Sequence, residues 1–171
     1  RFLLYVGGMS PHKNLTALIL AYIELLDDPK FDDVKLVLVG EYVADAFYSD
    51  YPALKELVVQ NRLADRVTFT GFIDDLDLAG LYNATSCFVF PSLVEGFGLP
   101  AVEAMACGAP VAASRAGSLP EILDGAGRLF DPSDSGELVA ILKLVLSDEP
   151  LRQTMRTQGL ARAKRFGWQR A

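Results

Sequence analysis

The chain has 171 residues, of which 51% are hydrophobic and 22% are charged, and its formal net charge is −6. A chain of this length buries roughly 70% of its unfolded surface, which excludes a disulfide-dependent peptide and a disordered chain. The length also argues against two full domains. Nucleic acid is excluded as the main partner, because binding phosphates requires a basic surface.

Short apolar runs bounded by Gly, Asp or Pro predict the strands. They cover residues 2–6, 34–39, 66–69, 87–90 and 110–113, and 128–130 is a candidate sixth strand. Their apolar character is nearly continuous, which is typical of parallel strands buried on both faces.

Apolar residues at helical spacing separate these runs. Helices are predicted over 15–26, from about 54 to 61, and over 77–83, 99–107, 138–145 and 151–165. The alternation predicts an α/β fold, a Rossmann-like doubly wound parallel sheet with helices on both faces, formed by one domain over residues 1–171. Ligands of such sheets bind beyond the carboxyl ends of the strands, so the strand-to-helix turns are the candidate sites.

The turn after the first strand contains Gly7 and Gly8, and Lys13 stands near the start of the following helix. Free helix amides together with an ammonium group form an anion site. The glycines match neither the dinucleotide fingerprint nor a phosphate loop. By itself this turn is equally consistent with a solvated lysine.

The turn after the fourth strand places Glu95 before a predicted helix and Glu103 inside it, with Phe97 flanked by glycines between them. Two carboxylates at these positions can accept hydrogen bonds from pairs of hydroxyl groups, as a sugar offers. There are two alternatives to a binding role. Glu103 could be an acidic residue favoured by the helix dipole, and Glu95 could be a solvated loop residue. The glycine-rich spacing favours a binding role.

Phe72 and Ile73 follow the third strand and could flank an aromatic base, although Phe72 as a core residue is the simpler interpretation. His12 is the only histidine and Cys87 belongs to a predicted strand, so a hydrolase triad or a metal centre is not expected. Cys87 and Cys107 are both expected to be buried, reduced thiols.

Taken together, these turns resemble the C-terminal, donor-binding domain of family-4 retaining glycosyltransferases with the GT-B fold. The resemblance runs in collinear order through LLYVGGMSPHKNL (3–15), VTFTGFIDD (67–75), FVFPSLVEGFGLPAVEAMACGAPVAAS (88–114) and GSLPEILDGAGRLFDP (117–132). Its most specific element is EGFGLPAVE, in which seven residues separate Glu95 from Glu103.

The resemblance implies a role for each matching residue. Lys13 would contact the donor diphosphate, and Glu103 would hold the ribose hydroxyls. Glu95 would be the catalytic-site carboxylate on the reacting face of the transferred sugar, and orientation with front-face attack is favoured over a nucleophilic role. The remaining donor-binding positions are Gly8 near the diphosphate, where many members have Arg; Phe97, Gly98 and Leu99 at the sugar and diphosphate; and Phe72 and Ile73 at the nucleobase.

The implied reaction moves a hexose with retention from a nucleoside-diphosphate sugar, such as GDP-mannose or UDP-glucose, to a glycan or lipid-linked acceptor. No metal or other cofactor is expected. The chain would be part of a longer enzyme of polysaccharide biosynthesis whose N-terminal acceptor-binding domain lies outside it, so alone it would bind donor without transferring sugar. The alternative is a non-catalytic sugar-nucleotide-binding or regulatory module. A cytoplasmic location is expected, with the inner membrane face as a further possibility.

The last predicted helix is basic and has no acidic residue after position 150. Its positive side chains include Arg152, Arg156, Arg162, Lys164 and Arg165. Three interpretations are open: a junction with the N-terminal domain, a peripheral contact with an anionic membrane surface, and a solvated helix face.

Overall fold

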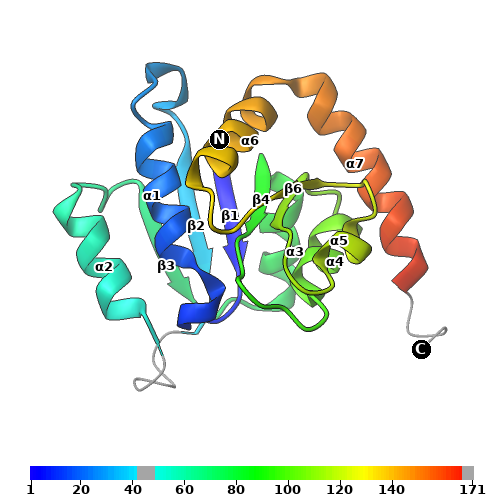
Figure 1. Cartoon of the computed structure of the whole chain (residues 1–171), viewed down its shortest axis with the longest axis horizontal. Coiled ribbons are helices and arrows are strands. Elements are labelled where there is room, and N and C mark those ends of the chain that lie inside the picture. Colours follow the sequence, from blue (N-terminus) through cyan, green and yellow to red (C-terminus); the bar gives the residue numbers. More distant parts are fainter. Residues whose placement is uncertain (42–48, 167–171) are drawn as a thin grey trace.

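The structure is a computed structural model that describes residues 1–41 and 49–166. Six parallel strands form one sheet in the order β3-β2-β1-β4-β5-β6 (Figure 1). The strands are β1 (Phe2–Val6), β2 (Lys35–Val39), β3 (Val67–Gly71), β4 (Cys87–Phe90), β5 (Val111–Ser114) and β6 (Arg128–Phe130). The predicted α/β fold with a doubly wound parallel sheet is therefore confirmed.

The helices cover both faces of the sheet. They are α1 (Leu15–Leu25), α2 (Tyr51–Gln60), α3 (Asp75–Ala84), α4 (Leu99–Ala106), α5 (Leu119–Leu123), α6 (Ser135–Ser147) and α7 (Glu149–Ala163), with 3₁₀ turns at Pro11–Lys13, Pro29–Phe31 and Lys164–Phe166. Helices α1, α2 and α6 pack on one face, and α3, α4, α5 and α7 pack on the other. The structure begins α2 earlier than predicted, because Pro52 fits the first turn of a helix and the apolar pattern starts only at Leu54.

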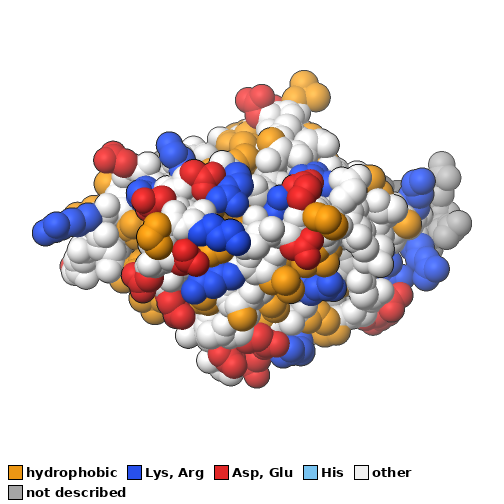
Figure 2. All heavy atoms as spheres, turned by 90° about the horizontal axis from the view of Figure 1, so that it is seen from above, with side chains coloured by type: hydrophobic (Ala, Val, Ile, Leu, Met, Phe, Trp, Pro, Cys, Tyr) orange, Lys and Arg blue, Asp and Glu red, His pale blue; other side chains and the backbone are white. Residues whose placement is uncertain are grey.

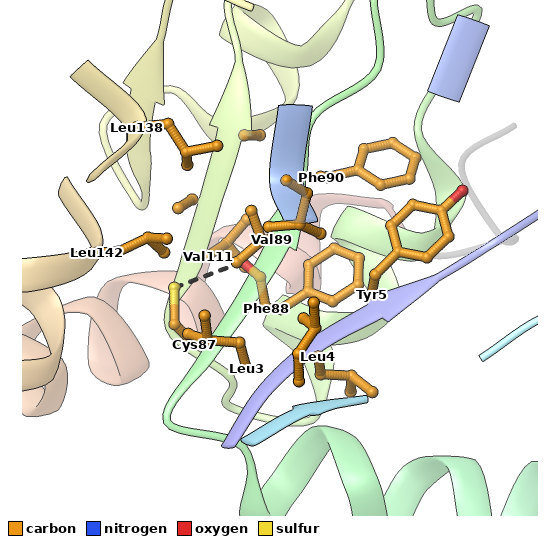
Figure 3. Packing of buried hydrophobic residues seen from close by; sticks show 14 of the residues in the cluster. Leu3, Leu4, Tyr5, Cys87, Phe88, Val89, Phe90, Val111, Leu138 and Leu142 are labelled. Atoms are coloured by element: carbon orange, nitrogen blue, oxygen red, sulfur yellow. Dashed lines mark hydrogen bonds between the residues drawn. The ribbon is translucent and has the colours of Figure 1, made fainter. Parts of the chain in front are cut away.

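Side chains of β4 alternate between the two layers of the core. Figure 3 shows Tyr5, Phe88 and Phe90 on one side of this strand, with Leu138 and Leu142 of α6 on the other. All five side chains are buried. The continuous apolar run of β4 thus supplies both layers, as expected for a central parallel strand.

The centre of the sheet is the point where the strand order reverses. From β1 the chain proceeds outward to β2 and β3, and it then returns to β4 on the other side of β1. The register joins β1 to β2 over five residue pairs but joins β1 to β4 only at Leu3–Cys87 and Leu4–Phe88. The turns that follow β1 and β4 therefore meet at the topological switch point, where ligands bind in sheets of this kind.

The basic helix α7 directs arginines into the domain. Arg156 donates hydrogen bonds to the carbonyl oxygens of Gly108 at 2.7 Å and Thr85 at 3.2 Å, beyond the ends of α4 and α3. Arg162 donates to the carbonyl oxygen of Ile122 in α5 at 3.0 Å. These guanidinium groups satisfy carbonyls that helix ends leave unpaired. Neither a solvated face nor a membrane face describes these two arginines.

Arg152 is likewise directed inward, toward the carbonyl oxygen of Val145 at 2.5 Å, and it pairs with Glu149. Lys164 and Arg165, in contrast, are exposed. Of the basic side chains singled out in this segment, these two remain available to an outside partner. The sequence could not separate the two groups, since every member is simply a positive residue on one helix.

Replacing Arg156 by alanine is expected to lower the free energy of unfolding by about 1–2 kcal/mol, because carbonyl oxygens at the ends of two helices lose a charged donor. Urea unfolding followed by circular dichroism measures the change. Lys164→Ala is the control and should stay within about 0.5 kcal/mol of the parent. Equal stability of the two variants would show that the Arg156 contacts contribute nothing.

The face on which the strands begin has acidic and basic side chains intermingled (Figure 2). Near the starts of β2 and β3, Arg66 pairs with Asp32 at 3.3 Å. Such exposed pairs contribute little to stability. Among the helices of residues 1–41 and 49–166, none is both long enough and apolar enough to cross a bilayer.

Candidate functional site

An ion pair joins the turns that follow β1 and β4. The ammonium group of Lys13 donates a hydrogen bond to Oε2 of Glu95 at 2.8 Å, and the two side chains are only 17% and 13% exposed. The same ammonium lies 5.4 Å from the centre of the Phe90 ring, a favourable position over its negative face. The structure thus brings together the residue predicted to bind the diphosphate, Lys13, and the residue predicted to bind the sugar, Glu95. The solvated interpretations of Lys13 and Glu95 are wrong.

Two hydrogen bonds fix the turns around this pair. The Leu93 amide donates to the carbonyl oxygen of His12 at 2.8 Å, which ties the β4 turn to the β1 turn. The Ser118 hydroxyl donates to the carbonyl oxygen of Phe97 at 2.9 Å, which ties the β5 turn to the same loop. Three strand-to-helix turns are therefore held together at the carboxyl edge of the sheet.

Gly117 lies directly behind Glu95. It has φ +53°, and a Cβ atom built at this position would lie 2.0 Å from the Glu95 carbonyl oxygen. Only glycine allows this approach in this conformation. The close contact holds the main chain of Glu95 in place from the β5 side.

The N-terminus of α4 presents amide groups to the site. Its N-cap is Gly98, which has φ +85° and has no side chain to accept from the first turn. Within the described ranges, the amides of Phe97, Gly98 and Leu99 have no protein acceptor. Free amides at a helix start attract phosphate and sugar oxygens. All three lie where the sequence predicted donor-binding amides.

Glu103 stands one turn further along α4, where its carboxylate accepts a hydrogen bond from the Tyr82 hydroxyl at 3.2 Å. Tyr82 is buried, and burial, reinforced by the negative charge of Glu103, raises the pKa of its hydroxyl. The hydroxyl therefore stays protonated and remains a donor. Tyr82 thus orients the Glu103 carboxylate through one oxygen, and among residues 1–41 and 49–166 the other oxygen has no hydrogen-bond partner.

A row of four buried rings supports both ends of the site. Tyr5 stacks with Phe90 at 6.2 Å between ring centres, Phe90 stacks with Phe88 at 5.7 Å, and Tyr82 meets Phe88 edge-on at 5.5 Å. At the other end, the Tyr5 hydroxyl donates to the carbonyl oxygen of Gly8 at 2.6 Å. The row thus links Gly8 to Glu103 through packed aromatic side chains, and Figure 3 shows its members Tyr5, Phe88 and Phe90.

Gly8 itself is exposed, and a Cβ atom built there meets nothing within 4 Å. The backbone at this position leaves room for a larger side chain. Glycine here is therefore not required by the packing, and the position has room for the arginine that the resemblance led us to expect.

The predicted nucleobase residues line an open groove of about 550 Å³ at the start of α3. Phe72 is 81% exposed, which overturns its interpretation as a core residue, and Ile73 is half-buried beside it. Asp74 and Asp77 contribute carboxylates to the same groove. Lys13 and Glu95 are not among the residues that line this groove.

Several supporting residues were not found from the sequence. Tyr5, Tyr82 and Gly117 act on the site from below or behind, and no spacing rule connects them to the residues they contact. Tyr5 belongs to an apolar strand and Tyr82 to a helix that is otherwise partly or fully exposed, so neither had a motif signal. The only signal for Gly117 was its place in a strand-to-helix turn.

The burial expected of both thiols is confirmed for Cys87 and not for Cys107. Cys87 is fully buried, and burial raises its pKa to about 12, so it is an inert thiol. Cys107 is only half-buried, which corrects the prediction for this residue. In the part of the chain that the structure describes, no three His, Cys, Asp or Glu side chains are grouped closely enough to bind a metal ion.

The doubly wound sheet, with a charged pair and free helix amides at its switch point, defines a Rossmann-like domain of the kind found in GT-B glycosyltransferases. The structure of the C-terminal domain of a glycosyl transferase group 1 family protein (LpcC) from Francisella tularensis is similar, with a TM-score of 0.82 and 32% identity over 96% of this chain and 85% of that one. Residues 1–162 match the family model described as glycosyl transferases group 1. The chain belongs to this glycosyltransferase family.

Two further comparisons describe relatives with named activities or ligands. The O-antigen chain mannosyltransferase B of Escherichia coli is 38% identical over 170 residues, which are 98% of this chain and 42% of the relative. Anabaena Alr3699/HepE, solved in complex with UDP-glucose, has a TM-score of 0.83 and 29% identity over 96% of this chain and 44% of that one. The chain therefore spans less than half the length of either protein.

Proposed function

We propose that this domain binds a nucleoside-diphosphate sugar at the switch point of its sheet and is the donor-binding part of a retaining hexosyltransferase. The observation on which the proposal rests is the Lys13–Glu95 pair beside the free amides of α4. Cationic and amide donors suit a diphosphate, and carboxylates suit sugar hydroxyls. The complex of Alr3699/HepE with UDP-glucose supports this class of ligand.

The proposed chemistry follows from where charge develops. When the bond between the anomeric carbon and the diphosphate breaks, negative charge accumulates on the leaving group. Lys13 and the N-terminus of α4 would stabilise that charge, which is the role of an electrostatic catalyst. Glu95 would hold the sugar hydroxyls so that the acceptor attacks from the face that the diphosphate leaves. No metal takes part in this scheme, so nucleotide binding is expected to be insensitive to EDTA.

The acceptor in this proposal is a glycan or a lipid-linked sugar, bound by an N-terminal domain outside this chain. Such an enzyme would act in polysaccharide biosynthesis in the cytoplasm or at the inner membrane face. The mannosyltransferase relative supports GDP-mannose as a donor to test, and Alr3699/HepE supports UDP-glucose. A non-catalytic sugar-nucleotide-binding module would share every one of these contacts, and would differ only in showing no turnover when joined to the acceptor domain.

Replacing Glu103 by alanine is expected to weaken nucleoside-diphosphate binding about ten-fold, because two ribose hydroxyls lose a charged acceptor. Isothermal titration of the 171-residue chain with UDP, GDP and ADP measures the affinity and identifies the base. The 2′,3′-dideoxy analogue of the nucleotide that binds is the control, since it has no hydroxyls for Glu103 to hold. The variant should bind that analogue as well as the parent does. Failure of the parent to bind any of the three nucleotides would contradict the proposed function.

A further inference from the structure

The Glu95 carboxylate and a bound diphosphate would compete for the ammonium group of Lys13. Lys13 donates to Glu95 at 2.8 Å, and the side chains are largely shielded from water. A diphosphate bound at Lys13 adds negative charge beside the same carboxylate. If Lys13 turns toward the phosphates, Glu95 loses its cationic partner in a site where water replaces that partner poorly. Leaving a shielded charge without its partner is costly.

The main chain cannot relieve this cost by moving away. Gly117 lies against the carbonyl oxygen of Glu95, and the neighbouring Leu93 amide is bonded to the His12 carbonyl oxygen. Glu95 must therefore find a new hydrogen-bond donor with its side chain alone. The ammonium of Lys13 lies over the Phe90 ring. The exchange of partners is thus confined to the carboxylate and the ammonium.

A nucleoside diphosphate and its sugar conjugate differ at this point. The diphosphate alone takes Lys13 and offers Glu95 no hydrogen-bond donor. An intact sugar nucleotide also brings sugar hydroxyls, which donate to a carboxylate and replace the interaction that Glu95 gives up. The energetic penalty of breaking the pair is therefore compensated only for the intact donor.

We infer that Glu95, through its pair with Lys13, makes the site discriminate against the spent nucleoside diphosphate in favour of the intact sugar nucleotide. This inference rests on the proposed function and adds a specificity role to it. Glu95 then lowers the affinity for the product that remains after transfer, which favours product release. A carboxylate that served only to hold the sugar would leave the affinity for the bare diphosphate unchanged.

The test is the replacement Glu95→Gln, which keeps the shape of the side chain and removes its charge. Isothermal titration compares the parent and the variant with UDP and UDP-glucose, and with GDP and GDP-mannose. The variant is expected to bind the bare nucleoside diphosphate about five-fold more tightly, because Lys13 is released and a nearby negative charge is gone. Its affinity for the sugar nucleotide should fall or rise less, so the ratio of the two affinities shifts toward the product.

Glu149→Gln is the matched control. Glu149 also forms a pair with an arginine, Arg152, but it begins α7 next to the end of α6, whose Leu146 carbonyl accepts from Arg1 at the start of β1. This control therefore removes one carboxylate charge at the opposite edge of the sheet. Both affinities should match those of the parent. Glu95→Ala is a second variant, which should show the same rise in nucleoside-diphosphate affinity without the glutamine amide.

The outcomes separate the two proposals. If the parent binds none of these nucleotides, the proposed function fails and this inference fails with it. If the parent binds but Glu95→Gln and Glu95→Ala leave the affinity for the bare diphosphate unchanged or lower it, the donor site stands and the discrimination by Glu95 is refuted. A rise in both variants but not in Glu149→Gln supports the inference.

Discussion

Replacing Gly117 by alanine is expected to destabilise the domain by about 2–4 kcal/mol and to weaken nucleotide binding at least ten-fold. The new Cβ atom would lie 2.0 Å from the carbonyl oxygen of Glu95, so one of the two turns must move. Because Glu95 sits on the displaced turn, its carboxylate would move away from Lys13, and the amides of α4 would move away from the positions in which they face the site. Urea unfolding and isothermal titration with the nucleotide that the parent binds measure the two effects.

The control for this variant is Gly125→Ala. Gly125 also has positive φ, at +83°, but a Cβ atom built there meets nothing within 4 Å. It should cost only the backbone strain of a left-handed alanine, about 1–2 kcal/mol, and should leave nucleotide affinity intact. Similar losses of affinity in both variants would mean that the contact behind Glu95 does not support the site.

The second large effect is expected from Lys13→Met, which keeps the aliphatic stem over Phe90 and removes the ammonium group. Affinity for the nucleoside diphosphate should fall about 10- to 100-fold, the loss expected for a charged hydrogen bond to phosphate. The variant should also lose about 1–2 kcal/mol of stability, because Glu95 is left as a shielded carboxylate without a cation. Titration and urea unfolding test both parts.

Two further variants separate these causes. Lys13→Met combined with Glu95→Gln should recover the stability but not the affinity, since the unpaired charge is removed while the phosphate ligand stays absent. Lys30→Met is the matched control, because Lys30 also lies over an aromatic ring, at 5.8 Å from the centre of Phe31, but outside the candidate site. An unchanged affinity in Lys13→Met would remove Lys13 from the donor site.

The sheet could be predicted because its information is local. Each strand is a short apolar run ended by a turn residue, and the structure moves the ends by only a residue or two. The start of β2 moves from residue 34 to 35, and β3 extends to Gly71, where it pairs with Val39. Strand ends depend on these neighbours, which a single segment does not reveal.

The site was predicted less completely, because its geometry joins segments that are far apart in the sequence. Lys13 and Glu95 were each identified as ligands, yet nothing in the sequence showed that they contact one another. The simpler interpretation of Phe72 as a buried core residue was wrong for the same reason, since an aromatic residue after a strand is more often buried. The arginines of α7 had no periodic or motif signal for their carbonyl partners.

The short pairing of β1 with β4, here called the seam, has a consequence for the folding of the chain. Lys13 and Glu95 are 82 residues apart, and each belongs to one of the two halves that the seam joins. Closing a loop of this length costs entropy before any contact is gained. A ligand held by both turns would act as a cross-link between the halves, so ligand concentration and global stability become thermodynamically linked. The donor would then protect the chain against unfolding at the same seam that it occupies.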